Sequence, residues 1–176
     1  MDKNEAEEEV EDAGFAVVPP SGFVRVVNQK SAANRACWRR VHPNSDEVEL
    51  LTVSRTGSRL DQPTGRRLAK VAEKITKASV PANAKRVQVS ARALAGKPGE
   101  AHAETYRAHE DGARRQHSLF RWFTNDRGDI VMVAIGASDR VSMEQLEQDA
   151  GAVVESFREL KKKTEPNVKK WWQFFK

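Results

Sequence analysis

The stretch from Lys85 to Leu160 constrains the fold of this 176-residue chain more than any other. It holds four strand-like segments separated by short turns, at residues 85–94, 101–109, 114–123 and 130–137. Strands joined by short turns must reverse direction, so this order predicts an antiparallel sheet. The fourth segment is the most apolar, which predicts a central position in that sheet.

Two amphipathic helices are predicted to cover the sheet. The later helix begins at Ser142, with Gln145 three residues on as a capping box, and its apolar stripe continues to Leu160. The earlier helix begins near Thr64 and ends before Pro81. Both helices are expected to bury one apolar stripe each against the sheet.

The N-terminal half adds further strand candidates, at residues 14–20, 22–27, 36–42 and 47–55. The first ends in two prolines, which cannot donate ladder hydrogen bonds, so an edge strand is expected there. Residues 47–55 are apolar on both faces, which predicts an inner strand. The sequence thus predicts one α+β domain over residues 13–160, an antiparallel sheet of about six to seven strands with helices packed on its faces.

The two ends of the chain carry opposite charge. Residues 1–12 hold seven acids and one lysine, and we expect a disordered acidic arm. Residues 161–176 form a basic aromatic tail with six lysines and one glutamate, separated from the last helix by Pro166. Whether the arm contacts the tail is left open by the sequence.

Composition narrows the function classes. A single cysteine, Cys37, excludes an intramolecular disulfide. The chain shows neither a long apolar span nor a signal peptide, so a cytoplasmic location is expected. The basic residues of the body are scattered among acids without a nucleic-acid-binding motif, and we do not expect nucleic acid as the partner.

The tail is the sharpest candidate for a contact site. Its lysines and aromatic residues are Lys169, Lys170, Trp171, Trp172, Phe174 and Phe175. Aromatic residues flanked by lysines suit an anionic membrane surface, a pocket on a protein partner, or a site on the chain's own domain. These three interpretations stay open from the sequence.

A second candidate lies on the strand at residues 85–94. Arg86, Gln88, Ser90 and Arg92 alternate there with apolar residues. They are expected to form a polar, positively charged sheet face. Such a face is usually only solvated, but it also suits an acidic partner or the chain's own arm.

No catalytic, metal-binding or cofactor-binding residues are predicted. His102 and His109 lie an odd number of positions apart on one strand, so they point to opposite faces, and a closed zinc site needs four ligands. No sequence motif places a histidine beside Cys37 to activate it as a nucleophile, and the Gly-x-Ser-x-Gly nucleophile elbow is not present.

The order of these elements resembles the Mog1/PsbP-like proteins, including the DcrB-like bacterial domains. The resemblance covers residues 13–160 and rests on the first strand with its proline turn, the strands over 36–55, the helix near 64–79, the four-strand run, and the ending Ser156-Phe157-Arg158. It implies an antiparallel sheet with helices on its faces. It also implies a non-enzymatic binding role, since members include a Ran-GTPase partner, a photosystem subunit, envelope lipoproteins and cytoplasmic effector chaperones.

The leading hypothesis is therefore a non-enzymatic, cytoplasmic protein-binding or chaperone-like module without a cofactor. The first alternative is a peripheral membrane protein held by its tail. The second is an enzyme of unrecognised type. Fold alone does not decide among them.

Overall fold

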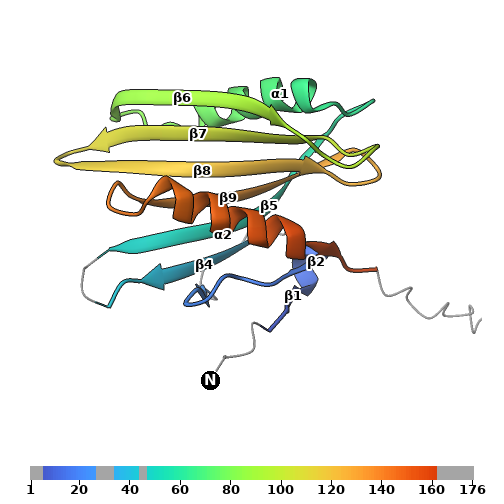
Figure 1. The fold of residues 1–176 in the computed structure, drawn as a ribbon, viewed down its shortest axis with the longest axis horizontal. Coiled ribbons are helices and arrows are strands. Elements are labelled where there is room, and N and C mark those ends of the chain that lie inside the picture. Colours follow the sequence, from blue (N-terminus) through green and yellow to red (C-terminus); the bar gives the residue numbers. More distant parts are fainter. Residues whose placement is uncertain (1–5, 27–33, 44–46, 162–176) are drawn as a thin grey trace, which may run out of the picture.

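A computed structural model describes residues 6–26, 34–43 and 47–161, and the structural statements below concern these residues (Figure 1). The elements in chain order are β1 (Glu8–Val10), a 3-10 turn (Glu11–Ala13), β2 (Phe15–Val17), β3 (Val24–Arg25), β4 (Arg35–Val41), β5 (Val48–Arg59), α1 (Gly65–Ala78), β6 (Lys85–Leu94), β7 (His102–Asp111), β8 (Arg114–Thr124), β9 (Asp129–Ser138), α2 (Met143–Ser156) and β10 (Arg158–Glu159).

Seven of these strands form one antiparallel sheet in the order β3-β4-β5-β9-β8-β7-β6. The predicted antiparallel run over β6 to β9 is confirmed, and β9 lies at the centre. Leu51 on β5 and Leu119 on β8 both lie opposite Ile135 on β9. Because directly opposed residues share a face, these three side chains bury one continuous row across the sheet.

Helix α1 covers one half of one sheet face. Thr64 caps its start by accepting a hydrogen bond from the backbone N–H of Arg67 at 3.3 Å. Leu68 and Ala72 are fully buried over β6, β7 and β8. Between this helix and β7 the hydroxyls of Thr76 and Thr105 lie 2.7 Å apart, so these two buried groups satisfy each other.

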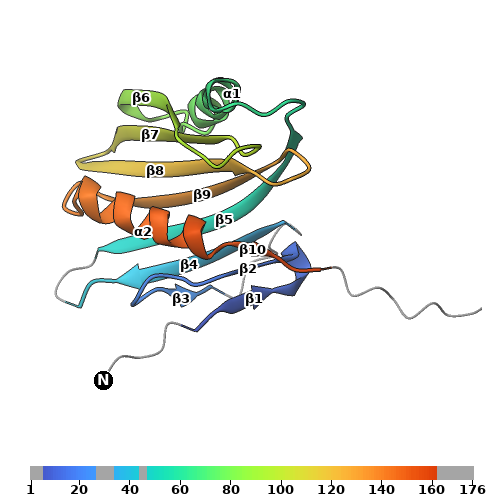
Figure 2. The same ribbon diagram turned by 45° about the vertical axis from the view of Figure 1, so that its right-hand side comes forward.

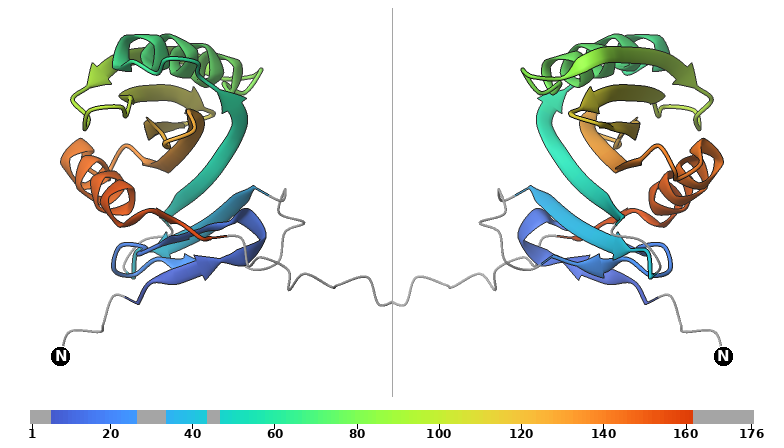
Figure 3. Two further views of the ribbon diagram at one scale, coloured as in Figure 1. Left: turned by 90° about the vertical axis from the view of Figure 1, so that its right-hand side faces the viewer. Right: turned by 90° about the vertical axis from the view of Figure 1, so that its left-hand side faces the viewer.

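Helix α2 lies on the opposite face, and the sheet curls around it (Figure 3). Ser142 caps its start by accepting from the backbone N–H of Gln145 at 3.2 Å, as the sequence predicts. Leu146, Ala150 and Val153 are fully buried in the larger of the two apolar cores, which α2 shares with β9, β8, β5, β4 and β2. The two helices therefore protect different parts of the sheet.

A second, three-stranded sheet in the order β1-β2-β10 joins the two ends of the domain (Figure 2). Two predictions are corrected here. Phe15–Val17 lies between two strands and is not an edge strand. The last helix ends at Ser156 and not at Leu160, because Arg158 and Glu159 become extended and pair with Ala16 and Phe15.

The small sheet includes residues that lie within the predicted acidic arm. Glu8 to Val10 form a strand, and the indole Nε1 of Trp38 donates to a carboxylate oxygen of Glu8 at 2.8 Å. Arg158 forms a two-pronged ion pair with Glu7, and its hydrogen bonds lower the pKa of the Glu7 carboxyl. Acids of the arm are thus held by the folded domain. Residues 1–5 lie outside the described part of the chain.

Candidate functional site

Half of the sheet face that carries α1 is left uncovered by either helix. We call this surface the open face and define it by Val24, Arg39, Val41, Val48 and Leu50 on β3, β4 and β5. Its apolar members are well exposed: Val24 is 66%, Val41 54%, Val48 44% and Leu50 54% accessible.

The strand register makes the open face continuous. Val24 lies opposite Arg39, Arg39 opposite Leu50, and Val41 opposite Val48. Leu50 lies opposite Gly136 on β9, so no side chain rises beside it there. Figure 3 shows α1 against the other end of the sheet, with no helix on the outer side of β5. The surface is therefore continuous, largely apolar and marked by one arginine.

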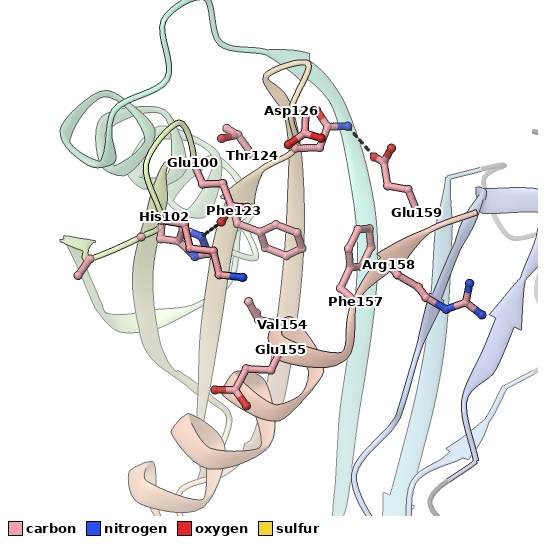
Figure 4. Close-up of a pocket in the computed structure, with 14 residues that line it drawn as sticks. Glu100, His102, Phe123, Thr124, Asp126, Val154, Glu155, Phe157, Arg158 and Glu159 are labelled. Atoms are coloured by element: carbon pink, nitrogen blue, oxygen red, sulfur yellow. Dashed lines mark hydrogen bonds and ion pairs between the residues drawn. The ribbon is translucent and has the colours of Figure 1, made fainter. Parts of the chain in front are cut away.

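A groove of about 680 Å³ opens at the end of α2 (Figure 4). We call it the C-terminal groove. It is bounded by the β6–β7 loop, the β8–β9 turn, the last turn of α2 and β10. A smaller hollow of about 200 Å³ between α2 and strands β6 to β8 shares His102, Val154 and Glu155 with it, so the two are adjacent.

The floor of the C-terminal groove is aromatic. The rings of Phe123 and Phe157 meet edge to face with centroids 5.0 Å apart. The ring of His102 stacks on Phe123 at 6.0 Å, and its Nε2 lies 3.1 Å from a carboxylate oxygen of Glu100. Gly96 allows this arrangement, since a Cβ there would lie 2.5 Å from the His102 ring.

The groove is lined by four acids, Glu100, Asp126, Glu155 and Glu159, against two bases, Lys97 and Arg158, so its rim carries an acidic excess. Glu159 is held by Asn125, whose side-chain nitrogen donates to it at 2.6 Å. Asp126 and Glu155 have no basic partner among the described residues. Figure 4 shows the two phenylalanine rings between Asp126 and Glu155, with Arg158 directed away from the groove. The groove therefore combines an apolar floor with two free carboxylates.

The groove lacks the arrangement expected of a hydrolytic site. Among its described lining residues, Thr124 carries the only hydroxyl, and that oxygen accepts a hydrogen bond from the backbone N–H of Ala101 at 3.1 Å. The hydroxyl is buried and faces no base. Cys37 lies elsewhere, on β4, with its sulfur 3.5 Å from the hydroxyl of Thr52.

A buried ionic cluster joins β4 and β5 to the middle of α2. Glu49 is completely buried and binds the guanidinium of Arg40 through both carboxylate oxygens, at 2.6 and 3.0 Å. Arg40 also contacts Asp149 on α2 at 2.5 Å, and His42 lies 2.8 Å from Glu49. Burial disfavours the charge of Arg40, but its hydrogen bonds to the two acids outweigh burial and raise its pKa. Each charged group of the cluster is paired with another member of the cluster. We therefore interpret the cluster as a contribution to stability and not as a binding site.

The predicted contact residues on β6 are engaged by neighbouring side chains. Arg86 pairs with Glu110 at 3.1 Å, and Gln88 accepts from Arg115 at 3.1 Å. Arg92 bridges Glu104 at 2.6 Å and Glu147 of α2 at 3.3 Å. The predicted single face is corrected at Arg86, because a bulge with φ of 47° at this residue breaks the alternation before Gln88.

The tail residues Lys169, Lys170, Trp171, Trp172, Phe174 and Phe175 lie outside the described residues. Within the described part, no helix is long and apolar enough to cross a membrane. The described residues also contain no cluster of three or more His, Cys, Asp or Glu side chains able to hold a metal ion.

The open face and the groove were both missed by sequence reasoning. The sequence does contain the apolar residues of the open face, Val48 and Leu50. Because residues 47–55 are apolar on both faces, both faces were expected to be buried. The signal for the groove was the ending Ser156-Phe157-Arg158, which the sequence identified only as part of a family resemblance.

Comparisons with known proteins establish the fold. No family model and no curated protein matches the chain. Three solved structures are similar: cyanobacterial PsbP from Synechocystis sp. PCC 6803 (18% identity, 86% of this chain and 89% of that chain, TM-score 0.49), a point mutant of the protein Mog1 (12%, 90% and 97%, 0.56), and LpqN, involved in cell envelope biogenesis of Mycobacterium tuberculosis (13%, 89% and 90%, 0.52). The likeness to Mog1 and LpqN shows that this chain has the Mog1/PsbP-like fold, as predicted. At these identities it shows the fold alone, and the fold is compatible with a non-enzymatic binding module.

Proposed function

We propose that this Mog1/PsbP-like domain is a non-enzymatic protein-binding module that docks its partner on the open face. A chaperone-like role is the form of this proposal in which the partner is an incompletely folded chain, since an exposed apolar sheet face suits the apolar side chains of such a segment. A cytoplasmic location stays a prediction from the sequence.

One observation carries the proposal. Five large hydrophobic residues are exposed among the described residues, and four of them lie on the open face. The fifth is Val87 on β6, at 42% accessibility. Single exposed hydrophobic residues are normal on a protein surface, whereas a contiguous group marks an interaction site.

The residues of the open face indicate what kind of surface a partner must present. Arg39 lies between Val24 and Leu50 in the register, and it has no acidic partner among the described residues. A guanidinium bordered by apolar side chains favours a carboxylate that arrives with apolar neighbours. We therefore propose an apolar partner surface that presents at least one acid to Arg39.

The test uses two matched substitutions in the full chain. Leu50→Glu places a charge in the centre of the open face, and Val87→Glu places the same charge on the exposed hydrophobic residue outside it. Each protein is immobilised and exposed to native lysate, and retained proteins are identified by mass spectrometry. Thermal melts of both variants serve as the folding control.

The proposal expects a protein that is retained by the unchanged chain and by Val87→Glu but lost with Leu50→Glu. Retention of the same proteins by all three chains would overturn it. Sedimentation equilibrium covers a further outcome, because a dimer that dissociates only with Leu50→Glu would make a second copy the occupant and refute a heterologous partner. Binding to anionic vesicles that depends on Leu50 would instead favour a membrane surface and count against the proposal.

A further inference from the structure

We infer that the C-terminal groove is the docking site of the chain's own basic aromatic tail, residues 162–176. This contact is separate from the open face. Four features carry the inference: the apolar floor, the free acids of the rim, the place where the described chain ends, and the charge of the alternative surface.

The floor suits aromatic side chains. Phe157 is only half-buried, although it already contacts Phe123 and Phe15 at centroid distances of 5.0 and 5.4 Å. Val154 beside it is also half-buried. Further rings can therefore pack on an apolar floor that the described residues leave partly open, and aromatic pairs of this kind add about 0.5–1.5 kcal/mol each beyond burial.

The rim suits lysine. Asp126 and Glu155 flank the floor and have no basic partner among the described residues (Figure 4). The tail carries Lys169 and Lys170 directly before its four aromatic residues. A segment that inserts aromatic rings between these two acids thus brings cations to the carboxylates. The tail carries lysines on both sides of its aromatic residues, at Lys170 and Lys176, and the groove carries acids on both sides of its phenylalanine rings.

The described chain ends close to the groove. Arg158 and Glu159 line it, and Lys161 is the last described residue. Trp171 follows Lys161 by ten residues, which span at most about 36 Å when extended. The sequence Glu165-Pro166-Asn167 is a turn signal within this stretch, so the chain has both the length and the local chemistry to reverse onto the groove.

Charge selects the groove over the open face. The open face is apolar as well, but its only charged member is Arg39. A tail with five lysines and one glutamate between residues 162 and 176 is repelled there and attracted at the acidic rim. The same chain therefore directs its tail to one apolar surface and leaves the other free.

The test detects contact within the full chain. Cys37→Ser removes the only cysteine, and Gln173→Cys then carries a nitroxide spin label between Trp172 and Phe174. Backbone amide signals near the label broaden in NMR spectra. We expect broadening at Lys97, Asn125 and Glu155 in the groove, and none at Val41 or Leu50 on the open face.

Charge reversal tests the acids. Asp126→Lys with Glu155→Lys should abolish the broadening of the groove amides. Asp111→Lys with Asp139→Lys is the matched control: it makes the same change of charge at two exposed turn residues near the opposite end of α2, and the broadening should persist. Thermal melts show whether each variant is folded.

A substitution in the tail keeps the inference testable if the groove variant fails to fold. Lys169→Glu with Lys170→Glu leaves the described domain unchanged and should also abolish the broadening. Raising the salt concentration to about 1 M should weaken it, because exposed charges are screened at short range.

Several results would overturn the inference. These are the absence of selective broadening in the groove, broadening of the open-face amides, and broadening that survives both charge reversals. Mixing isotope-labelled protein with spin-labelled, isotope-free protein gives a final check. Groove broadening in that mixture would place the tail on a second copy and refute the intramolecular contact.

Discussion

The backbone N–H of Val18 donates a hydrogen bond to the hydroxyl of Ser156 at 2.9 Å, across 138 positions of sequence. Ser156 is the last residue of α2, and its hydroxyl donates in turn to the carbonyl of Val153 at 3.0 Å. One side chain thus fixes the end of the last helix and anchors the chain directly after β2. Two residues further on, Arg158 and Glu159 pair with β2 and complete the small sheet.

Ser156→Ala should destabilise the domain by about 1–2 kcal/mol, because the N–H of Val18 loses its acceptor in a partly buried position. Urea unfolding followed by circular dichroism measures the change. Ser90→Ala on exposed β6 is the control and should change stability by less than about 0.5 kcal/mol. Equal effects of the two substitutions would contradict a role for the Val18–Ser156 hydrogen bond.

Gly128→Ala should be far more damaging than Gly112→Ala. Both glycines have positive φ, 81° and 61°, so both substitutions carry the backbone strain of a left-handed residue. A Cβ at Gly128 would lie 2.4 Å from the carbonyl oxygen of Leu60, whereas a Cβ at Gly112 meets nothing within 4 Å. We expect Gly128→Ala to cost about 1–3 kcal/mol more in chemical denaturation. Similar losses would show that the β8–β9 turn adjusts freely.

Glu49→Gln should lower the free energy of unfolding by about 3 kcal/mol. The substitution leaves the partly buried guanidinium of Arg40 with Asp149 as its remaining acid, and breaking one partner out of a buried pair is costly. Asp111→Asn, in an exposed turn, is the matched amide control. Guanidinium chloride unfolding of both variants measures the difference, and a loss at Glu49 no larger than that at Asp111 would refute this account of the cluster.

Stability should fall as the pH falls below about 6.5, in part because of His117. Burial lowers the pKa of His117, and the nearby backbone of Ser138 and the charge of Asp139 offset this only in part. As the pH falls, His117 is protonated in the unfolded chain before it is protonated in the folded chain. The stability that comes from neutral His117 is therefore fully present above the unfolded pKa and is lost at lower pH.

His117→Gln should reduce that pH dependence. Denaturant midpoints at pH 7.5 and at pH 5.5 measure it for the unchanged protein and for the variant. An unchanged difference between the two midpoints would mean that His117 does not resist protonation in the fold.

The main sheet was predictable because its information is local. Turn residues such as Gly112 and Gly128 separate strands whose order then dictates antiparallel pairing, and the apolar run from Ile130 requires a central position. The cap at Ser142 follows from the same short-range chemistry. The end of α2 was predicted wrongly, since its apolar stripe continues to Leu160, while pairing with β2 makes the chain extended from Phe157.

The two candidate surfaces could not be predicted because they depend on contacts distant in sequence. Leu50 is apolar and belongs to an inner strand, as predicted. Helix α1, however, packs on β6 to β8 and leaves the Leu50 side of β5 exposed. The acids Asp126 and Glu155 lie 29 positions apart and come to line the same groove only in the folded chain. The bulge at Arg86 likewise has no signal in the residue pattern around it.

The small three-stranded sheet has a consequence for the order of events during synthesis. Its first two strands leave the ribosome early, but the strand that seals them is Arg158–Glu159. Until that segment has left the exit tunnel, the buried residues Phe15 and Val17 lack their final covering, and α2 cannot be anchored through Ser156. The domain therefore cannot mature strand by strand as it is translated. Its N-terminal segment must wait for nearly the whole domain to be made, a period in which its apolar side chains depend on transient protection.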